Sequence, residues 1–165
     1  MYPDHIKAFP KFANFVCRQL PLMVRNEKIL DIIQKVAGEI PRKNIENSLL
    51  WGHLPWLMPA TLDVDGLHVP NSDKIQINYL HVLEFQNGLD ALQAPNGQAV
   101  KFLCVTLLHE LTHWADMYDK KSRGDGAEEA GFLFEKLAYG GNIHSPKTLD
   151  ELLAKYGEWH PKISH

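Results

Sequence analysis

The feature that most constrains this fold is the segment from about Gly97 to Tyr118, which the sequence predicts to be one long helix. Its apolar residues lie on nearly every side of the helix axis: Val100, Leu103, Val105, Leu107, Leu108, Leu111 and Trp114. A helix that is apolar all round is buried in protein. Four ionisable side chains of this segment lie within residues 109–116, those of His109, Glu110, His113 and Asp116. The fold must supply partners for all of them, because an unpaired buried polar group costs several kcal/mol.

Three of these polar side chains share one stripe of the helix. Successive helical residues are about 100° apart, so with His109 at zero His113 falls at about 40° and Asp116 at about −20°. The letters spell H-E-x-x-H, the spacing at which two imidazoles converge on one zinc ion and the glutamate between them reaches the metal-bound water. Core histidines with hydrogen-bond partners are the alternative. The position in mid-helix, after an extended strand, favours the metal site.

A zinc peptidase of this type needs a third protein ligand, and the stretch "GAEEAGFLFEKLAYGG" offers candidates. It predicts a helix from Ala127 to Tyr139. On the helical wheel one polar stripe consists of Glu128, Glu135 and Tyr139. Glu129 and Lys136 fall on a different side, which is typical of a solvated face, so no site role is expected for Glu129.

The level of each acidic residue along the helix separates the candidates. If the loop 120–126 is short, an antiparallel helix returns to the level of the histidines some six to nine residues after Gly126, at about 1.5 Å per residue. This favours Glu135 as the third ligand, with Glu128 as the alternative and Asp116 as the weakest. The glutamate that does not bind metal is expected to orient a ligand imidazole through its other nitrogen.

Catalytic roles follow from the same pattern. Glu110 is the predicted general base, which takes a proton from water and passes it to the leaving amine. The oxyanion needs a donor besides the metal, and Tyr139 is the first candidate because it lies on the acidic stripe, with His144 as the second. The strand 74–78 is expected to be an edge strand that pairs with an extended substrate.

The rest of the chain predicts an α+β fold that is mainly helical, with a small sheet packed on the helix of the motif. Helices are predicted over 6–20, 26–36, 42–52 and 79–86, and a half-buried strand over 74–78. The 165 residues indicate one domain over 1–165. Its helical N-terminal part covers about 1–50, and the strand, the motif helix and the third-ligand helix cover about 60–141.

Composition excludes several classes of partner. With a net charge of −3 and no run of basic residues, nucleic acid and anionic membrane surfaces are not expected to be partners. Apolar runs stay far below the ~20 residues of a membrane helix. The N-terminal stretch "MYPDHIKAFPKF" lacks the pattern of a Sec signal, so synthesis in the cytoplasm is expected.

At "HELTHWAD" followed by "GAEEAGFLFEKLAYG", the sequence resembles the metallopeptidase toxin domains of bacterial polymorphic toxin systems. The resemblance extends to "FPKFANFVCRQLP", "LLWGHLPW" and "VPNSDKIQIN" and so covers nearly the whole chain. It implies a zincin-like fold, zinc-dependent peptide hydrolysis, and secretion or delivery into a target cell by a dedicated system. It carries over His109 and His113 as ligands and Glu110 as base, and matches acidic positions at both Glu128 and Glu135.

Three functions therefore stand as hypotheses. The first is a zinc metallopeptidase toxin or effector with one zinc ion per chain, a protein or peptide substrate and an immunity or inhibitor protein as partner. The second is a housekeeping or regulatory zincin with a cellular protein target. The third is a non-catalytic zinc-binding domain. Glu110 speaks against the third, because a structural zinc site closes its fourth position with another ligand and needs no base.

Overall fold

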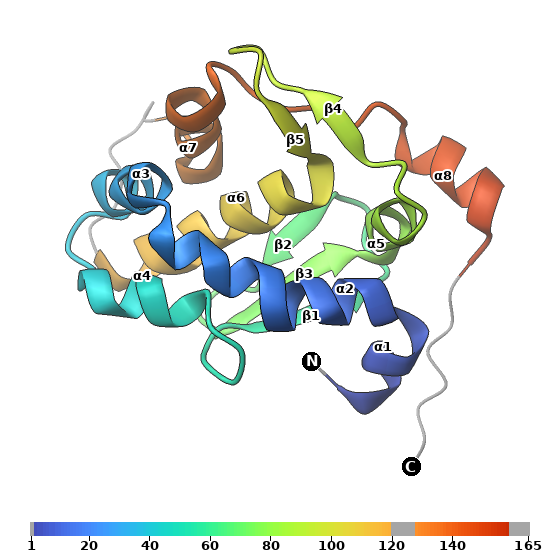
Figure 1. The fold of residues 1–165 in the computed structure, drawn as a ribbon, viewed down its shortest axis with the longest axis horizontal. Coiled ribbons are helices and arrows are strands. Elements are labelled where there is room, and N and C mark those ends of the chain that lie inside the picture. Colours follow the sequence, from blue (N-terminus) through green and yellow to red (C-terminus); the bar gives the residue numbers. More distant parts are fainter. Residues whose placement is uncertain (1, 120–127, 159–165) are drawn as a thin grey trace.

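The computed structural model describes residues 2–119 and 128–158, which form an α+β, mainly helical structure (Figure 1). The helices are α1 (Pro3–Ala8), α2 (Pro10–Asn14), η1 (Phe15–Gln19), η2 (Leu20–Arg25), α3 (Glu27–Ala37), α4 (Arg42–Ser48), α5 (Tyr79–Gln86), α6 (Phe102–Asp116), η3 (Met117–Asp119), α7 (Ala130–Tyr139) and α8 (Leu149–Tyr156). The strands are β1 (Trp56–Ala60), β2 (Gly66–His68), β3 (Lys74–Asn78), β4 (Ala91–Gln93) and β5 (Ala99–Lys101). None of the helices in these two ranges is long and apolar enough to cross a bilayer.

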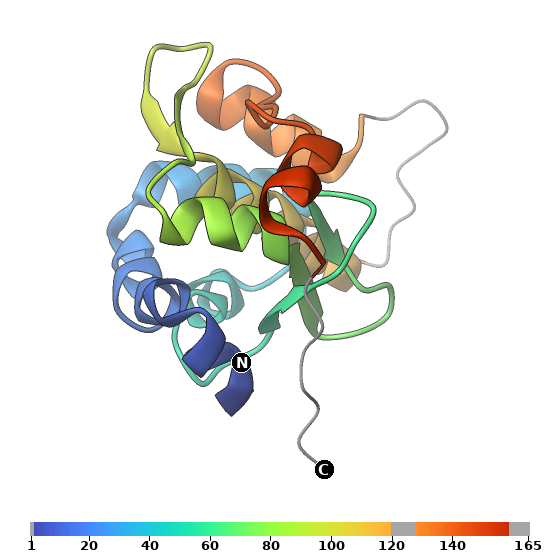
Figure 2. The same cartoon turned by 90° about the vertical axis from the view of Figure 1, so that its right-hand side faces the viewer.

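The motif helix α6 crosses the interior, as expected from its apolar surface (Figures 1 and 2). It contacts α3, α5 and α7, and strands β2 and β3. Its side chains Leu103 and Leu107 belong to the same buried cluster as Ile33 of α3, Ile75 of β3 and Phe134 of α7. The predicted packing of a small sheet on the motif helix is therefore present.

The sheet beside α6 has the strand order β1-β3-β2, so the predicted edge position of β3 is wrong. Strand β3 lies in the middle, parallel to β1 and antiparallel to β2. Residues Ile75 and Ile77 of β3 are fully buried, in keeping with its alternating pattern. Strand β2 is an edge strand of this sheet, and it contacts α6. Any strand addition on this side has to use β2.

Helix boundaries differ from the predictions where local chemistry breaks the apolar period. The segment predicted as one helix over 6–20 is divided into α1, α2 and η1, because Phe9, before Pro10, leaves the helical conformation with φ −129° and ψ 64°. Helix α3 agrees with its prediction: Asn26 caps it by accepting from the Ile29 N–H, and Gly38, at φ 77°, ends it.

The motif helix begins at Phe102, not near Gly97, because the preceding residues form a hairpin. Strand β5 pairs antiparallel with β4, and Gly97, at φ 85°, supplies the turn between them. A second element without a prediction is α8, which begins with a capping box between Thr148 and Glu151.

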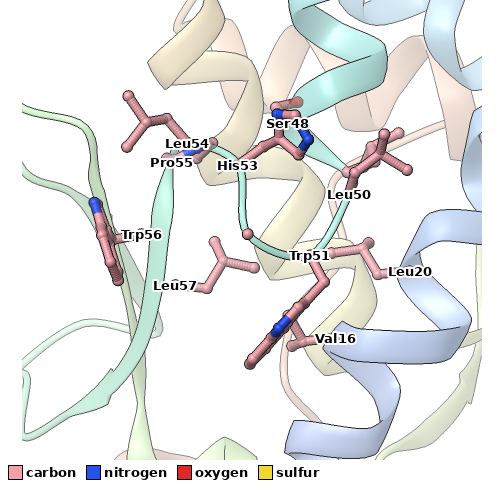
Figure 3. Close-up of a pocket in the computed structure, with 12 residues that line it drawn as sticks. Val16, Leu20, Ser48, Leu50, Trp51, His53, Leu54, Pro55, Trp56 and Leu57 are labelled. Atoms are coloured by element: carbon pink, nitrogen blue, oxygen red, sulfur yellow. The ribbon is translucent and has the colours of Figure 1, made fainter. Parts of the chain in front are cut away.

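A pocket of about 200 Å³ lies far along the chain from the motif, between η1 and the loop that leads into β1 (Figure 3). Trp51 and Trp56 stand at its rim with exposed side chains, and Leu57 lies between them (Figure 3). None of the residues that line it belongs to α6 or α7.

Candidate active site

Helix α6 carries the motif in a setting that satisfies its buried hydroxyl groups. Thr106 and Thr112 donate to the backbone carbonyls of Phe102 and Leu108, one turn back, at 3.1 and 2.8 Å. The imidazoles of His109 and His113 lie on one face with ring centroids 5.1 Å apart. Their side chains are 14% and 28% exposed, so both are accessible from one side of a buried helix. This arrangement agrees with the predicted stripe.

The carboxylate that meets both histidines is that of Glu129, not of Glu135 or Glu128. Its Oε1 lies 3.5 Å from His109 Nε2 and contacts His113 Nε2. One ligand atom from each of these three residues lies within 4.8 Å of the other two. Among the residues that the structure describes, this is the one group of His, Cys, Asp and Glu side chains with such a spacing.

Glu129 reaches the histidines because it precedes α7 instead of belonging to it. It is the N-cap residue, with extended backbone (φ −61°, ψ 141°), so a helical wheel does not describe its direction. Its Oε1 accepts from the N–H of Gly131 at 3.0 Å and its Oε2 from the N–H of Phe132 at 2.8 Å. The free N–H groups of a helix N-terminus favour a carboxylate. The helix was predicted to begin at Ala127, which lies outside the described residues; the observed α7 begins at Ala130.

Glu135 holds His109 from the other side. Its Oε1 lies 2.6 Å from His109 Nδ1 and its Oε2 accepts from the N–H of Ile143 at 2.6 Å. A carboxylate can only accept here, so Nδ1 carries a proton and Nε2 faces Glu129. Glu135 thus contacts His109 at Nδ1 and is not among the three residues whose ligand atoms converge, so it does not stand where its predicted ligand role requires. The loop 120–126, on whose length that prediction depended, lies outside the described residues.

The other residues predicted for this site lie elsewhere. Glu128 is exposed and pairs with Lys136 at 3.3 Å. Asp116 lines a cleft that also contains Glu110 and His113, but it is not one of the three residues of the ligand cluster. Tyr139 is 4% exposed and packs edge-on against Phe134, and burial raises its pKa well above the ordinary value. The structure does not bring Tyr139 to the cleft, because its ring is used for packing.

Two carboxylates next to His109 give the cluster a negatively charged environment. Burial lowers the pKa of His109, but hydrogen bonds to Glu129 and Glu135 outweigh burial and raise it to about 10. Burial also raises the pKa of Glu129, yet its hydrogen bonds to both histidines bring it far below the ordinary value. These groups therefore attract cations, either protons or a metal ion. Two imidazoles and one carboxylate, with convergent atoms, fit a divalent metal of the zinc type.

The close approach of α7 to His109 depends on Gly131. A Cβ at this position would lie 2.2 Å from both Nε2 and Cδ2 of His109. No side chain larger than hydrogen fits unless the imidazole or the helix moves. Gly131 thus allows α7 to pack closely against the His109 side of α6.

Glu110 lies next to the histidines and lines a cleft of about 510 Å³ with His113, Gly66 and Leu67. Its Oε2 accepts from the N–H of His68 at 2.6 Å. Burial raises the pKa of Glu110, against the opposing effect of the two neighbouring histidines. The cleft is therefore lined by one histidine of the cluster, His113, and by a carboxyl group that takes up a proton more readily than an exposed one.

One of three comparisons with known proteins found a match. The family model described as metallopeptidase toxin 3 matches residues 5–140, which include the histidines, Glu110 and Glu129. No curated protein and no solved structure matches the chain. A peptidase of this family requires a metal ion and a protein substrate, and a toxin acts in a target cell. The match covers most of the chain, and the chain therefore belongs to the metallopeptidase toxin family.

Proposed function

We propose that this toxin is a zinc-dependent peptidase with a zincin-like active site, in which His109, His113 and Glu129 bind one zinc ion per chain. The observation that supports the proposal is the convergence of these three side chains beside Glu110. Two histidines and one glutamate form a known ligand set of catalytic zinc, in which the fourth position is left for water or substrate. A structural zinc site has no use for a neighbouring carboxylate of this kind.

The hydrogen bonds around the cluster support the same assignment. Glu135 fixes the ring of His109 through Nδ1, so that Nε2 points toward Glu129. Carboxylates that hold the second nitrogen of a ligand histidine orient the ring and raise its basicity. The ligands must lose their protons when metal binds, and the raised pKa of His109, due to its two carboxylate partners, makes it a strong base.

Glu110 acts as general base and acid. A zinc ion in this site would lower the pKa of water and polarise the scissile carbonyl group. The N–H of His68 holds Oε2 of Glu110, and Oε1 has no hydrogen bond within residues 2–119 and 128–158, so it is the oxygen that receives the proton. Because burial raises the pKa of this carboxyl group, Glu110 retains the proton until the leaving amine takes it.

Strand β2 is the element proposed to align the substrate. In an antiparallel pair, alternate residues direct their backbone groups away from the partner strand. The N–H of His68 points outward in this sense, since it donates to Glu110 and not to β3. Gly66 is in phase with His68 and therefore presents its backbone to the same side. An extended peptide could pair with this edge, which would place its carbonyl groups beside the cleft.

The toxin function also suggests a route and a partner. We propose delivery of the chain into a target cell and, in the producing cell, an inhibitor protein that covers the cleft. The inhibitor would be identified by its stable complex with the Glu110→Gln variant, in which cleavage cannot consume it.

Metal content and growth test the proposed function. Purified chain is expected to carry about one zinc ion, and a protein with both His109→Ala and His113→Ala to carry none; full zinc retention in that double variant, measured by elemental analysis, contradicts the site. Glu110→Gln should keep the zinc, because Gln has the same shape, and yet abolish toxicity, because Gln cannot accept the proton. Equal growth inhibition by wild type and Glu110→Gln, expressed to the same level, would show that the toxicity is not hydrolytic.

A further inference from the structure

The segment after α7 lies outside the residues that the family model matches and yet contacts the site. The match ends at residue 140. Gly140 ends α7 in the left-handed conformation, at φ 84°. The chain then leads to α8, which begins at Leu149. Helix α8 lies beside α5 (Figures 1 and 2), and in the view of Figure 1 the β4–β5 hairpin stands between α8 and α7. We call residues 141–156 the C-terminal clasp.

The near end of the clasp holds an orienting residue of the proposed metal site. The N–H of Ile143 donates to Glu135 Oε2 at 2.6 Å. The other oxygen of the same carboxylate contacts His109 Nδ1 at 2.6 Å. Ile143 and Glu135 are both buried, at 7% and 4% exposure, so water does not compete readily for these hydrogen bonds. A continuous chain of hydrogen bonds therefore runs from the backbone of the clasp to His109.

The far end of the clasp is anchored on a buried carboxylate of α5. Glu84 accepts from Lys147 and Lys155, each at 2.7 Å, and from the hydroxyl of Tyr156. Burial alone raises the pKa of Glu84, but these donors outweigh burial and hold the pKa at about 2. Leu152 of α8, which lies between Lys147 and Lys155 in the sequence, is fully buried in the core.

This anchor lies close to the orienting contact. Only residues 144–146 separate Ile143 from Lys147, so the position of Lys147 restrains the position of the Ile143 N–H. Buried ion pairs are weak evidence for stability, since apolar residues of similar volume often replace them without loss. A buried glutamate with three donors from one segment does, however, define where that segment lies. The anchor is thus suited to positioning.

We propose that the C-terminal clasp positions His109 for metal binding: Glu84 fixes the clasp, the Ile143 N–H fixes Glu135, and Glu135 fixes the imidazole. This inference rests on the proposed zinc site. It makes Ile143 and Glu84 positioning residues, and it makes residues 141–156 a working part of the peptidase although they lie beyond the family match.

The test compares two proline substitutions in the full chain. Ile143→Pro removes the N–H that Glu135 accepts, whereas His144→Pro removes an N–H that has no acceptor in the described part of the chain. Ile143→Val keeps the N–H and serves as the conservative variant. Zinc affinity is measured by competition with a chelator, at a temperature where circular dichroism shows each metal-free variant to be folded. This readout reports on the site itself and not on the loss of stability that a merely structural role would cause.

Loss of a group that orients a metal ligand costs about 10-fold to 100-fold in metal affinity. We expect a loss of this size in Ile143→Pro, and wild-type affinity in Ile143→Val and His144→Pro. Equal zinc affinity in Ile143→Pro and His144→Pro would overturn the inference. If Ile143→Pro does not fold, Glu84→Gln decides: weaker zinc binding supports the clasp, and unchanged binding overturns it. Failure of the wild type to bind zinc through His109 and His113 would instead reject the proposed function.

Discussion

The substitution Gly131→Ala isolates the close approach of α7 to the proposed metal site. The added Cβ would lie 2.2 Å from Nε2 and Cδ2 of His109, whereas non-bonded atoms settle at about 3.5 Å or more. The imidazole or the helix must therefore move by about 1.3 Å, which is about 3.5 Å minus 2.2 Å. The ring cannot turn away freely, because Glu135 holds Nδ1 from the opposite side.

The energies favour a specific loss of metal binding over a loss of fold. Alanine is better than glycine in a helix by about 0.5–1 kcal/mol, and crowding costs about 1–3 kcal/mol, so the two effects partly cancel in the metal-free protein. A displacement of about 1 Å in a functional site typically costs about 100-fold. We expect zinc affinity to fall by about that factor, or about 2.8 kcal/mol at about 1.4 kcal/mol per factor of ten.

In this experiment zinc affinity is measured by competition with a chelator, and the stability of the metal-free protein by denaturant unfolding in excess chelator. Two further variants serve as controls. Leu137→Ala, on the exposed side of α7, should leave zinc affinity unchanged. Gly66→Ala places a Cβ 2.8 Å from Thr106 Cγ2 and 3.0 Å from Glu110 Cγ, so it should reduce cleavage and retain zinc. If Gly131→Ala binds zinc as tightly as wild type, the reasoning about this approach is refuted.

Three other predictions concern charge. Glu129→Ala should remove zinc from the site and Glu128→Ala should not, because only the first carboxylate meets the histidines; similar zinc content in the two variants would reject Glu129 as a ligand. Burial lowers the pKa of His109, but its partners Glu129 and Glu135 outweigh burial and raise the pKa to about 10. Zinc must therefore displace a proton from His109, and the affinity for zinc should rise about tenfold per pH unit between about pH 6 and pH 8. A zinc affinity that does not change with pH, measured by chelator competition, would contradict this. Burial raises the pKa of Glu84, but its hydrogen-bond donors outweigh burial and lower the pKa from 4.5 to about 2. Its contribution to stability is therefore complete above about pH 4.5 and is lost as the pH falls toward 2. The free energies of unfolding of wild type and Glu84→Gln should converge over that range, and a constant difference between them would show that the anchor contributes nothing.

The sequence alone determined the part of the site that lies within one helix. His109, Glu110 and His113 follow each other at helical spacing, and this spacing sets their relative directions whatever surrounds them. The apolar surface of the same helix determined that it would be buried. Helix α3 and the strand over 74–78 were likewise predictable, because a cap at Asn26 and an alternating pattern are local signals. The capping box of α8 was an equally local signal.

Only the tertiary structure decided which carboxylate completes the cluster. Glu129 comes from a different segment and stands one residue before its helix, where the backbone is extended and the periodicity of the helix does not apply. The predicted start of this helix, at Ala127, lies three residues before the observed start at Ala130, so the helical wheel was applied to Glu129 although it is not in the helix. Strand order is a similar case. The central place of β3 depends on a parallel pairing with β1 and an antiparallel one with β2, and such pairings between distant segments leave no mark on either strand alone.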